Sequence, residues 1–267
     1  MARQTRGLKE LLYTMFLFLG SLVVHAQNPH RGIYTHSHND YLRTQPFFNA
    51  YENQFSSIEM DVFLVGDELL VAHDKKDIDP DRTIEKLYLQ PLLDQILKNG
   101  GKAYAGKAKL QFLIDIKTEA EPALRCLEKK LKPLRHYFDG VNNSNAIRIV
   151  ISGNMPSPER FHLFDEIFYF DGRSTVNYSS KQLERVPMFS ASFEKFSTWK
   201  GIGEFNANEY IQVKSFVDSV HCLDKKVRFW GTPDTQTLWK TFITLEVDYI
   251  NTDSPAELSF FLNNYKK

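Results

Sequence analysis

Short apolar runs alternate with amphipathic segments along most of the chain. Nine of these runs are rich in β-branched and aromatic residues, and most are apolar without interruption, as is typical of strands buried on both faces of a parallel sheet. They lie at residues 31–35, 56–65, 68–74, 110–117, 146–153, 166–172, 186–192, 227–233 and 247–253. The pattern therefore predicts an α/β fold in which most strands run parallel.

Helical patterns fill most of the intervals between these runs. They lie at residues 87–100, 121–138, 208–226, 234–246 and 254–265, with a short turn at 157–164. In the fourth of them, Leu238, Phe242 and Leu245 share one face at spacings of four and three. Gly100 is a natural stop for the first helix, and Pro133 is expected to break or kink the second.

The number and spacing of these elements predict a (β/α)8 TIM barrel. Strand and helix alternate about eight times over roughly 240 residues, which is the size and rhythm of that fold. The run at 68–74 follows the run at 56–65 too closely for a helix, so residues 65–68 are expected to form a hairpin turn that extends the second strand. An open, doubly wound sheet is the main alternative, but no glycine-rich phosphate loop follows the first run.

The N-terminal residues have the pattern of a secretory signal peptide. A positively charged start precedes the apolar run at 11–24, and Val24 and Ala26 stand where a signal peptidase requires small side chains. Residues 1–26 are therefore expected to be removed, and the protein is expected to be secreted or periplasmic. An uncleaved N-terminal anchor is the alternative. Residues 27–267 are expected to form a single domain.

Composition narrows the choice of partners. Of the 267 residues, 42% are hydrophobic and 25% are charged, with a formal net charge of zero, which is ordinary for a globular protein. No basic cluster is long enough to neutralise several phosphates, so no nucleic-acid partner is expected. The protein is expected to be a monomer. Cys126 and Cys222 allow one disulfide, although two buried thiols are the favoured interpretation.

Several acidic residues lie in the carboxyl-terminal parts of the predicted strands. In TIM barrels the active site is at this end of the strands. Glu59 and Asp61 lie two residues apart on one strand, and Asp115 and Lys117 have the same spacing on a later one, so each pair points to one face. Buried carboxylates cost several kcal/mol unless they are paired or bind a metal. A hard divalent cation, Mg²⁺ or Ca²⁺, would offset their repulsion.

Histidines flank this carboxylate strand. His36 and His38 follow the first apolar run, and His73 with Asp74 ends the third. One histidine before the carboxylates and one after them would suit a general base and a general acid on either side of a substrate. None of these residues is specific alone, and their conjunction at successive strand ends is what points to catalysis.

The order of these residues resembles the order of motifs in the superfamily of glycerophosphodiester phosphodiesterases and phosphatidylinositol-specific phospholipases C. A histidine comes first, then Glu-x-Asp, then His-Asp after a short hairpin, then an acid-x-Lys pair. The match runs from Tyr34 to about Thr118 and resumes at residues 228–234 and 247–255. The segment from "HSHNDY" to "LLVAHD" also resembles the altered-inheritance-of-mitochondria proteins of fungi and their bacterial relatives. The resemblance implies a TIM barrel that hydrolyses a phosphodiester with the help of a metal.

Departures from the usual motifs leave glycerophosphodiesters and phospholipid headgroups both open as substrates. Glycerophosphodiesterases usually begin with His-Arg-Gly, whereas "SHNDYL" at 37–42 is more similar to the "SHNTYL" of eukaryotic phosphoinositide phospholipases C. There the histidine is catalytic and the asparagine is a metal ligand, which implies these roles for His38 and Asn39. "IDIKT" at 114–118 resembles the Asp-x-Lys-Thr of spider-venom phospholipase D. In the combined scheme the catalytic residues are His38, His73 and Lys117, and the substrate-binding residues are Trp230 and Arg228. One divalent cation is bound by Glu59, Asp61, Asp115 and Asn39.

Two other classes of protein compete with this scheme. A zinc-dependent, amidohydrolase-like barrel would use His36 and His38 as a His-x-His pair. It needs further histidines at later strand ends, and the remaining candidates lie in predicted helices or the short turn. We therefore expect His36 to support the metal or His38 from behind. The other class is a non-catalytic ligand-binding barrel, against which the complete set of acidic ligands argues.

The substrate partner is expected to be a small-molecule or lipid phosphodiester. Aromatic residues at 191–210 would suit a lid or a peripheral membrane contact. A packed connection between a strand and a helix is the favoured interpretation of that segment.

Overall fold

The computed structural model describes residues 33–265, so the predicted signal peptide at residues 1–26 lies outside the described residues. The strands are β1 (Tyr34–Ser37), β2 (Ser57–Val65), β3 (Glu68–Val71), β4 (Gln111–Ile116), β5 (Arg148–Gly153), β6 (Phe168–Gly172), β7 (Met188–Ser192), β8 (Lys226–Trp230) and β9 (Tyr249–Thr252). The α-helices are α1 (Phe48–Glu52), α2 (Gln90–Lys98), α3 (Ala120–Leu131), α4 (Ser180–Leu183), α5 (Ala207–His221), α6 (Gln236–Thr244) and α7 (Pro255–Asn264). Every predicted strand run overlaps one of these strands.

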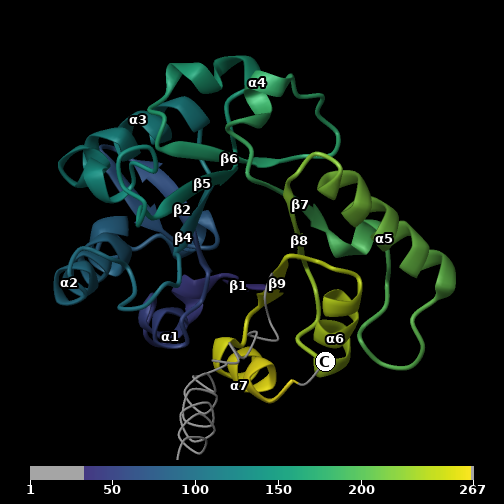
Figure 1. Ribbon diagram of the computed structural model, residues 1–267. Helices are drawn as coiled ribbons and strands as arrows, with labels where there is room; N and C mark the ends of the chain where they lie inside the picture. Colours follow the sequence, from purple (N-terminus) through teal and green to yellow (C-terminus); the bar gives the residue numbers. More distant parts are fainter. Residues whose placement is uncertain (1–32, 266–267) are drawn as a thin grey trace, which may run out of the picture. The chain divides into compact units, whose positions relative to one another are not determined.

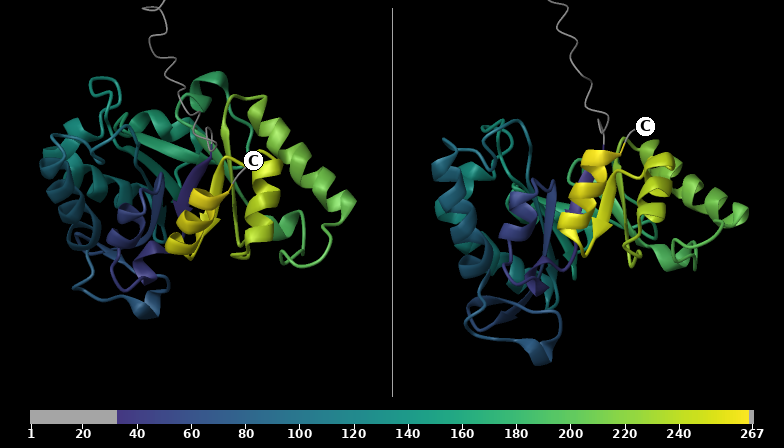
Figure 2. Two further views of the ribbon diagram at one scale, coloured as in Figure 1. Left: turned by 60° about the horizontal axis from the view of Figure 1, so that its bottom comes forward. Right: turned by 90° about the horizontal axis from the view of Figure 1, so that it is seen from below.

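The sheet closes on itself into a barrel of parallel strands (Figure 1). The strand order is β1-β9-β8-β7-β6-β5-β4-β2-β3, and a further pairing of β1 with β2 joins the two ends of the ring. All pairs within the ring are parallel, and β3 is antiparallel to β2. The prediction of a (β/α)8 barrel with a hairpin after the second strand is confirmed, and the open doubly wound sheet is excluded. Helices flank the outside of the strands (Figure 2).

The hairpin returns the chain to the rim of the barrel. Val65 pairs with Glu68 across a two-residue turn, and Gly66 in that turn has a φ of 60°, which glycine adopts without steric cost. After β3, the backbone N–H of Ala72 donates to the carbonyl oxygen of Asp61 at 3.3 Å. This bond brings the next residue, His73, close to β2, with its Nδ1 3.5 Å from Oδ2 of Asp61.

Helices α2 and α3 end close to Gly100 and Pro133, the residues that predicted their ends. α2 stops before Gly100, which has a φ of 63°. α3 stops at Leu131, and a 3₁₀ helix at Lys132–Tyr137 takes up Pro133, which lacks the N–H that a continuing α-helix needs. The crossovers after β5 and β6 contain only a 3₁₀ turn and the four-residue α4. Among the described residues, no helix has the length and apolar character needed to cross a membrane.

The interior of the barrel changes in chemistry from one end to the other. Since side chains alternate along a strand, positions two apart share the inner face. Leu113, Val150, Met188 and Tyr249 form a small apolar cluster. On β4, the next inward position after Leu113 is Asp115. An apolar layer therefore lies beneath a polar mouth at the carboxyl ends of the strands.

The two cysteines are free thiols. Cys126 is half-buried, and its Sγ donates to the carbonyl oxygen of Asp67 at 3.3 Å. Cys222 is exposed, so the expectation of two buried thiols is wrong for this residue. It follows the last turn of α5, whose apolar face is already filled by other side chains.

The aromatic segment at residues 191–210 is a packed connection. Phe193 is buried, and the ring centroid of Phe196 lies 5.4 Å from that of Phe229. The ring of Trp199 stacks on a neighbouring phenylalanine with centroids 4.7 Å apart. The favoured interpretation of this segment is confirmed, although Ile202 at its tip is 81% exposed.

Candidate active site

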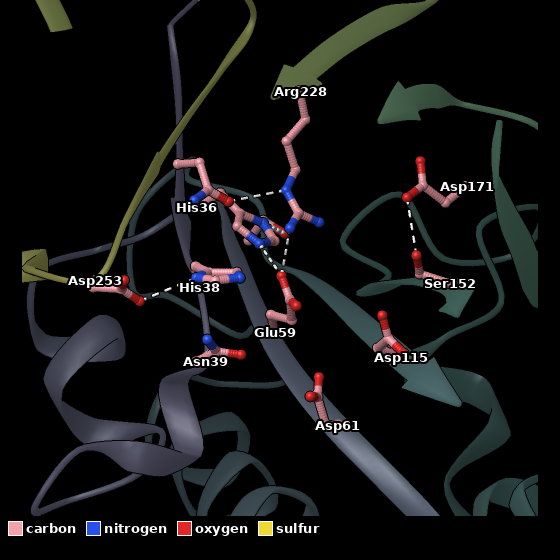
Figure 3. A network of polar contacts seen from close by, with 12 residues as sticks. His36, His38, Asn39, Glu59, Asp61, Asp115, Ser152, Asp171, Arg228 and Asp253 are labelled. Atoms are coloured by element: carbon pink, nitrogen blue, oxygen red, sulfur yellow. Dashed lines mark hydrogen bonds and ion pairs between the residues drawn. The ribbon is translucent and has the colours of Figure 1, made fainter. Parts of the chain in front are cut away.

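Three carboxylates converge at the carboxyl mouth of the barrel (Figure 3). Glu59 and Asp61 lie two residues apart on β2, and Asp115 is the partner of Asp61 in the register of β4. Each of the three offers an oxygen atom within 4.8 Å of the others. Glu59 and Asp61 are almost fully buried, and Asp115 is partly exposed. Strand alternation thus brings all three acidic candidates together.

This cluster fits a hard divalent cation. Burial and the charge of Glu59 raise the pKa of Asp61 to about 6, and burial raises the pKa of Asp115. Oδ1 of Asp61 is buried and has no hydrogen-bond partner within residues 33–265. A cation would offset the repulsion between the carboxylates and would be bound by this unpartnered oxygen. Carboxylate oxygens suit Mg²⁺ or Ca²⁺ better than they suit Zn²⁺.

Lys117 borders the cluster on the side of β4. Its Nζ lies 3.0 Å from Oδ2 of Asp61 and 3.0 Å from Oδ1 of Asp115. These two carboxylates raise the pKa of Lys117 although its partial burial lowers it, so the side chain is cationic at neutral pH. A positive charge therefore stands at the edge of the carboxylate cluster.

Glu59 is held from behind by two side chains. Nη2 of Arg228 donates to its Oε2 at 2.7 Å, and Nε2 of His36 lies 2.7 Å from the same oxygen. Burial raises the pKa of Glu59, but the charge of Arg228 and the hydrogen bond from His36 outweigh burial and lower it. Arg228 also donates to Asn251, and Nδ1 of His36 lies 2.8 Å from the hydroxyl of Ser57. Both contacts of Glu59 use Oε2, which leaves Oε1 for a cation.

The position of His36 argues against a zinc pair with His38. His36 is fully buried, and both of its ring nitrogens contact protein groups. The buried group of possible ligands in residues 33–265 consists of carboxylates without a histidine. His36 therefore supports Glu59, and the contact of Arg228 with a phosphate stays a prediction.

Acid should destabilise the protein through His36. Burial lowers the pKa of His36 from 6.5 to about 3, so between these values the unfolded state binds more protons than the folded state. The stabilisation is complete above pH 6.5 and is lost as the pH falls, by at most about 1.4 kcal/mol per pH unit. His36→Gln keeps a donor and removes this titration, so its free energy of unfolding in urea should change less between pH 6.5 and 4.5. His162→Gln, at an exposed position, is the control, and an unchanged slope in His36→Gln would contradict the neutral state of His36.

His38 has a carboxylate partner that the sequence did not assign. Its Nδ1 lies 3.0 Å from Oδ1 of Asp253, which directly follows β9. Since a carboxylate only accepts, the proton is on Nδ1, and Nε2 is free to accept one. Burial raises the pKa of Asp253, but the hydrogen bond and charge of His38 and the charge of Arg43 outweigh it and lower the pKa. Figure 3 shows the ring of His38 between Asp253 and the carboxylate cluster.

Tyr41 links the other candidate residues, and it too was missed. Its hydroxyl lies 2.8 Å from Oδ1 of Asn39, 2.7 Å from Oδ2 of Asp61 and 3.0 Å from Nδ1 of His73. Tyr41 is almost fully buried, whereas half of the His73 side chain is exposed. Nδ1 of His73 faces the hydroxyl, so Nε2 is left for a substrate. Asn39 has a φ of 47°, a left-handed conformation that asparagine tolerates.

Asp40 fixes the loop that carries these groups. It is fully buried and accepts hydrogen bonds from Oγ of Ser37 at 2.9 Å, the backbone N–H of Phe47 at 2.6 Å and the hydroxyl of Tyr88 at 3.0 Å. Tyr88 comes from a π-helix at Glu85–Leu89. The "SHNDYL" segment is therefore held as a rigid turn. Its sequence shows the acid, but the three donors come together only in the fold.

Gly153 at the end of β5 makes room for Asp115. A Cβ on Gly153 would lie 2.1 Å from Oδ1 of Asp115 and 2.6 Å from the carbonyl oxygen of Ile116, and its φ is +68°. Gly153→Ala should therefore displace Asp115, cost about 1–3 kcal/mol of stability and weaken divalent-cation binding by at least about tenfold. Gly66→Ala is a matched control, because Gly66 has a φ of +60° with nothing within 4 Å of the added Cβ. Equal cation affinities of the two variants in calorimetric titration would rule out this role of Gly153.

The far wall of the mouth is also polar. Oγ of Ser152 donates to Oδ2 of Asp171 at 3.0 Å, and burial raises the pKa of Asp171 to about 6. Figure 3 shows this pair on the side opposite His38. Trp230, the last residue of β8, is 45% exposed. The mouth is thus polar on both sides, with an exposed indole at the carboxyl end of β8.

Two family profiles match the chain. Residues 27–163 match the profile described as AIM6-like phosphodiesterase domain, and residues 226–256 match that of the glycerophosphoryl diester phosphodiesterase family. The first match contains the carboxylate cluster and both histidines, and the second contains Arg228 and Asp253.

Relatives agree with these matches. The altered inheritance of mitochondria protein 6 homolog of Arthroderma benhamiae is 25% identical, over 82% of this chain and 80% of its own. The protein of that name from Kluyveromyces lactis is 28% identical, over 85% and 71%. A calcium-dependent phosphoinositol-specific phospholipase C from Pseudomonas sp. has a similar fold, with a TM-score of 0.53 and 11% identity over 85% of this chain and 91% of its own. The chain belongs to the AIM6-like phosphodiesterase domain family.

Proposed function

We propose that the protein is a metal-dependent phosphoric diester hydrolase that uses two-histidine acid–base catalysis. The observation that carries the proposal is the convergence of three carboxylates within 4.8 Å in a mouth that also holds His38 and His73. Such a cluster suits a hard cation, and two histidines suit an acid and a base. Asn39 is the proposed fourth ligand, since Tyr41 connects its Oδ1 to Asp61.

The charges of the mouth suit a phosphodiester monoanion. Three carboxylates face two cationic side chains, Lys117 and Arg228, which leaves one net negative charge. A divalent cation at the carboxylates would make that balance positive and would neutralise charge developing on the oxygens at phosphorus. Lys117 would bind the same phosphate oxygens and orient them.

His38 is the proposed general base. Asp253 holds its Nδ1–H and would stabilise the imidazolium that forms. Nε2 of His38 takes the proton from the attacking hydroxyl, which belongs to the substrate or to water, as the new oxygen–phosphorus bond forms.

His73 is the proposed general acid. The hydroxyl of Tyr41 orients its ring through Nδ1, and the exposed Nε2 gives its proton to the leaving alcohol oxygen as the old phosphorus–oxygen bond breaks. If the attacking hydroxyl belongs to the substrate, water then opens the cyclic phosphate with the two histidines in reversed roles.

Family and fold guide the choice of substrate and ion. A glycerophosphodiester or a phospholipid headgroup is the proposed substrate class, with Trp230 as a wall of the pocket and Arg228 as a further phosphate contact. One cation, Mg²⁺ or Ca²⁺, is the proposed cofactor. Ca²⁺ is the first to test, because the phospholipase C of similar fold is described as calcium-dependent.

Exposed apolar side chains around the mouth support a lipid substrate. Leu42, Val65, Ile202 and Trp230 are between 45% and 81% exposed, and each is the last residue of a strand or lies in the connection that follows one. A peripheral membrane contact at this end is therefore proposed. The proposed location, secreted or periplasmic, and the proposed monomeric state without a nucleic-acid partner rest on the sequence pattern and its balanced charge.

The test is a phosphorus NMR assay of the chain from residue 27 onward. It compares glycerophosphodiesters, lysolipids and inositol lipids in Ca²⁺, Mg²⁺, Zn²⁺ or EDTA. We expect turnover of at least one substrate class with Ca²⁺ or Mg²⁺ and none in EDTA. Turnover restored only by Zn²⁺ would favour the zinc scheme, and the absence of both turnover and a cation-dependent rise in melting temperature would favour a non-catalytic barrel.

A further inference from the structure

The amino ends of the barrel strands carry a second set of inward-facing side chains. Tyr34, Lys226 and Tyr249 are the first residues of β1, β8 and β9, and Arg148 is the first residue of β5. Each lies two positions before an inward-facing residue of the next layer, as Tyr34 does before His36. The alternation that builds the catalytic mouth therefore also builds the opposite end of the barrel.

These side chains surround a cavity of about 350 Å³, a volume within the usual range of small-molecule sites. Its lining includes three cationic side chains, Lys109, Arg148 and Lys226, and three tyrosines, Tyr34, Tyr169 and Tyr249. None of the carboxylates or catalytic histidines at the carboxyl mouth lines it. The cavity is therefore separate from the candidate active site.

The positive charge of this cavity is not neutralised by the described residues of its lining, which include no aspartate or glutamate. Among residues 33–265, the guanidinium of Arg148 has no ion pair, and its Cζ lies over the ring of Tyr169, 5.4 Å from the centroid. Nζ of Lys226 lies 4.2 Å from the ring centroid of Tyr34, and the carboxylate of Asp248 outside the cavity is 3.9 Å away. An anion in the cavity would gain two cationic partners.

The aromatic side chains give the cavity a flat apolar wall. The rings of Tyr34 and Tyr249 are tilted, with centroids 5.2 Å apart. The hydroxyl of Tyr249 donates to Oε1 of Gln111 at 3.2 Å, which holds that ring in place. Tyrosine faces and a guanidinium plane bind flat rings by stacking and cation–π attraction.

We propose that the amino end of the barrel is a second binding site, for a small organic anion that carries a flat ring, such as an aryl phosphate or a nucleoside monophosphate. The anionic group lies between Arg148 and Lys226, and the ring packs against Tyr34 and Tyr169. The proposal does not depend on hydrolysis at the other end of the barrel.

Calorimetric titration of the chain from residue 27 onward tests the site, with EDTA present so that the carboxyl mouth holds no cation. Phenyl phosphate is the probe, and inorganic phosphate and phenol are its two parts. We expect phenyl phosphate to bind one site at least about tenfold more tightly than either part. The double variant Arg148→Gln, Lys226→Gln should weaken phenyl phosphate binding by at least about tenfold, with hydrolysis of the diester within about twofold of wild type.

Two variants serve as controls. Lys195→Gln, Lys240→Gln removes the same charge from exposed positions outside the cavity, and Lys117→Gln alters the carboxyl mouth. Both should bind phenyl phosphate as wild type does. No binding by wild type, or a loss caused by Lys117→Gln or by the control pair, would overturn the proposal.

A further variant covers the case in which the double variant does not fold. Tyr169→Leu should weaken phenyl phosphate binding and leave inorganic phosphate binding unchanged. Equal losses for both probes would show that no ring packs there.

Discussion

His38→Ala and His73→Ala should each reduce the rate of hydrolysis of a glycerophosphodiester by about 10²–10⁴-fold, which is the usual contribution of a positioned acid or base. Nε2 of His38 is free because Asp253 occupies Nδ1, and Nε2 of His73 is free because Tyr41 occupies Nδ1. Initial rates at saturating Ca²⁺ provide the measurement. His162→Ala is the control at an exposed position.

The leaving group separates the two roles. p-Nitrophenolate leaves without protonation, so loss of the general acid should matter much less for bis(p-nitrophenyl) phosphate than for an alkyl diester. His73→Ala should recover activity toward the aryl substrate, whereas His38→Ala should stay impaired with both. If either variant keeps near wild-type activity toward the alkyl diester, the two-histidine scheme is wrong, and the opposite pattern of recovery would exchange the roles.

Replacing Asp61 with asparagine should abolish catalysis and yet stabilise the cation-free protein. Burial and the charge of Glu59 raise the pKa of Asp61 from 3.8 to about 6. The free energy of unfolding therefore falls as the pH rises between these two values, because ionised Asp61 is less stable in the folded state than in the unfolded state. The penalty is on the order of 3 kcal/mol at pH 7. In EDTA, Asp61→Asn should therefore melt at a higher temperature than wild type, while Ca²⁺ should no longer raise its melting temperature.

The stability effect should depend on pH. Well below pH 3.8, the unfolded-state pKa, wild-type Asp61 is protonated in both states, so the advantage of Asp61→Asn in EDTA should disappear there. Asp67→Asn, at an exposed turn position, should show neither the stabilisation nor the loss of the Ca²⁺ effect. Retention of a wild-type Ca²⁺ shift by Asp61→Asn would remove this residue from the proposed ligands.

Local patterns predicted the parts of the site that lie along single strands. Glu59 and Asp61, like Asp115 and Lys117, share a face because strand geometry repeats every two residues. Parallel strands then bring their carboxyl ends to one mouth, which is why the predicted carboxylates meet within 4.8 Å. The hairpin after β2 could be predicted for a similar reason, since the chain between the runs is too short for a helix.

Pairings between distant segments could not be predicted in this way. Asp253 lies 215 residues from His38 in the chain, and the two meet because the last strand pairs with the first when the barrel closes. The sequence predicted no role for Tyr41, but its hydroxyl contacts Asn39, Asp61 and His73 from three separate segments. Arg228 was expected at a phosphate, yet its hydrogen bonds go to Glu59 and Asn251.

The sequence by itself therefore determined the barrel, the hairpin and the identity of the acidic cluster, because each depends on periodicity over a few residues. The tertiary structure alone decided which partners hold His38, His73 and Glu59, how Gly153 makes room for Asp115, and which side chains surround the cavity at the amino ends. Those contacts depend on the register of nonadjacent strands around a closed ring, and no local spacing in the chain encodes that register.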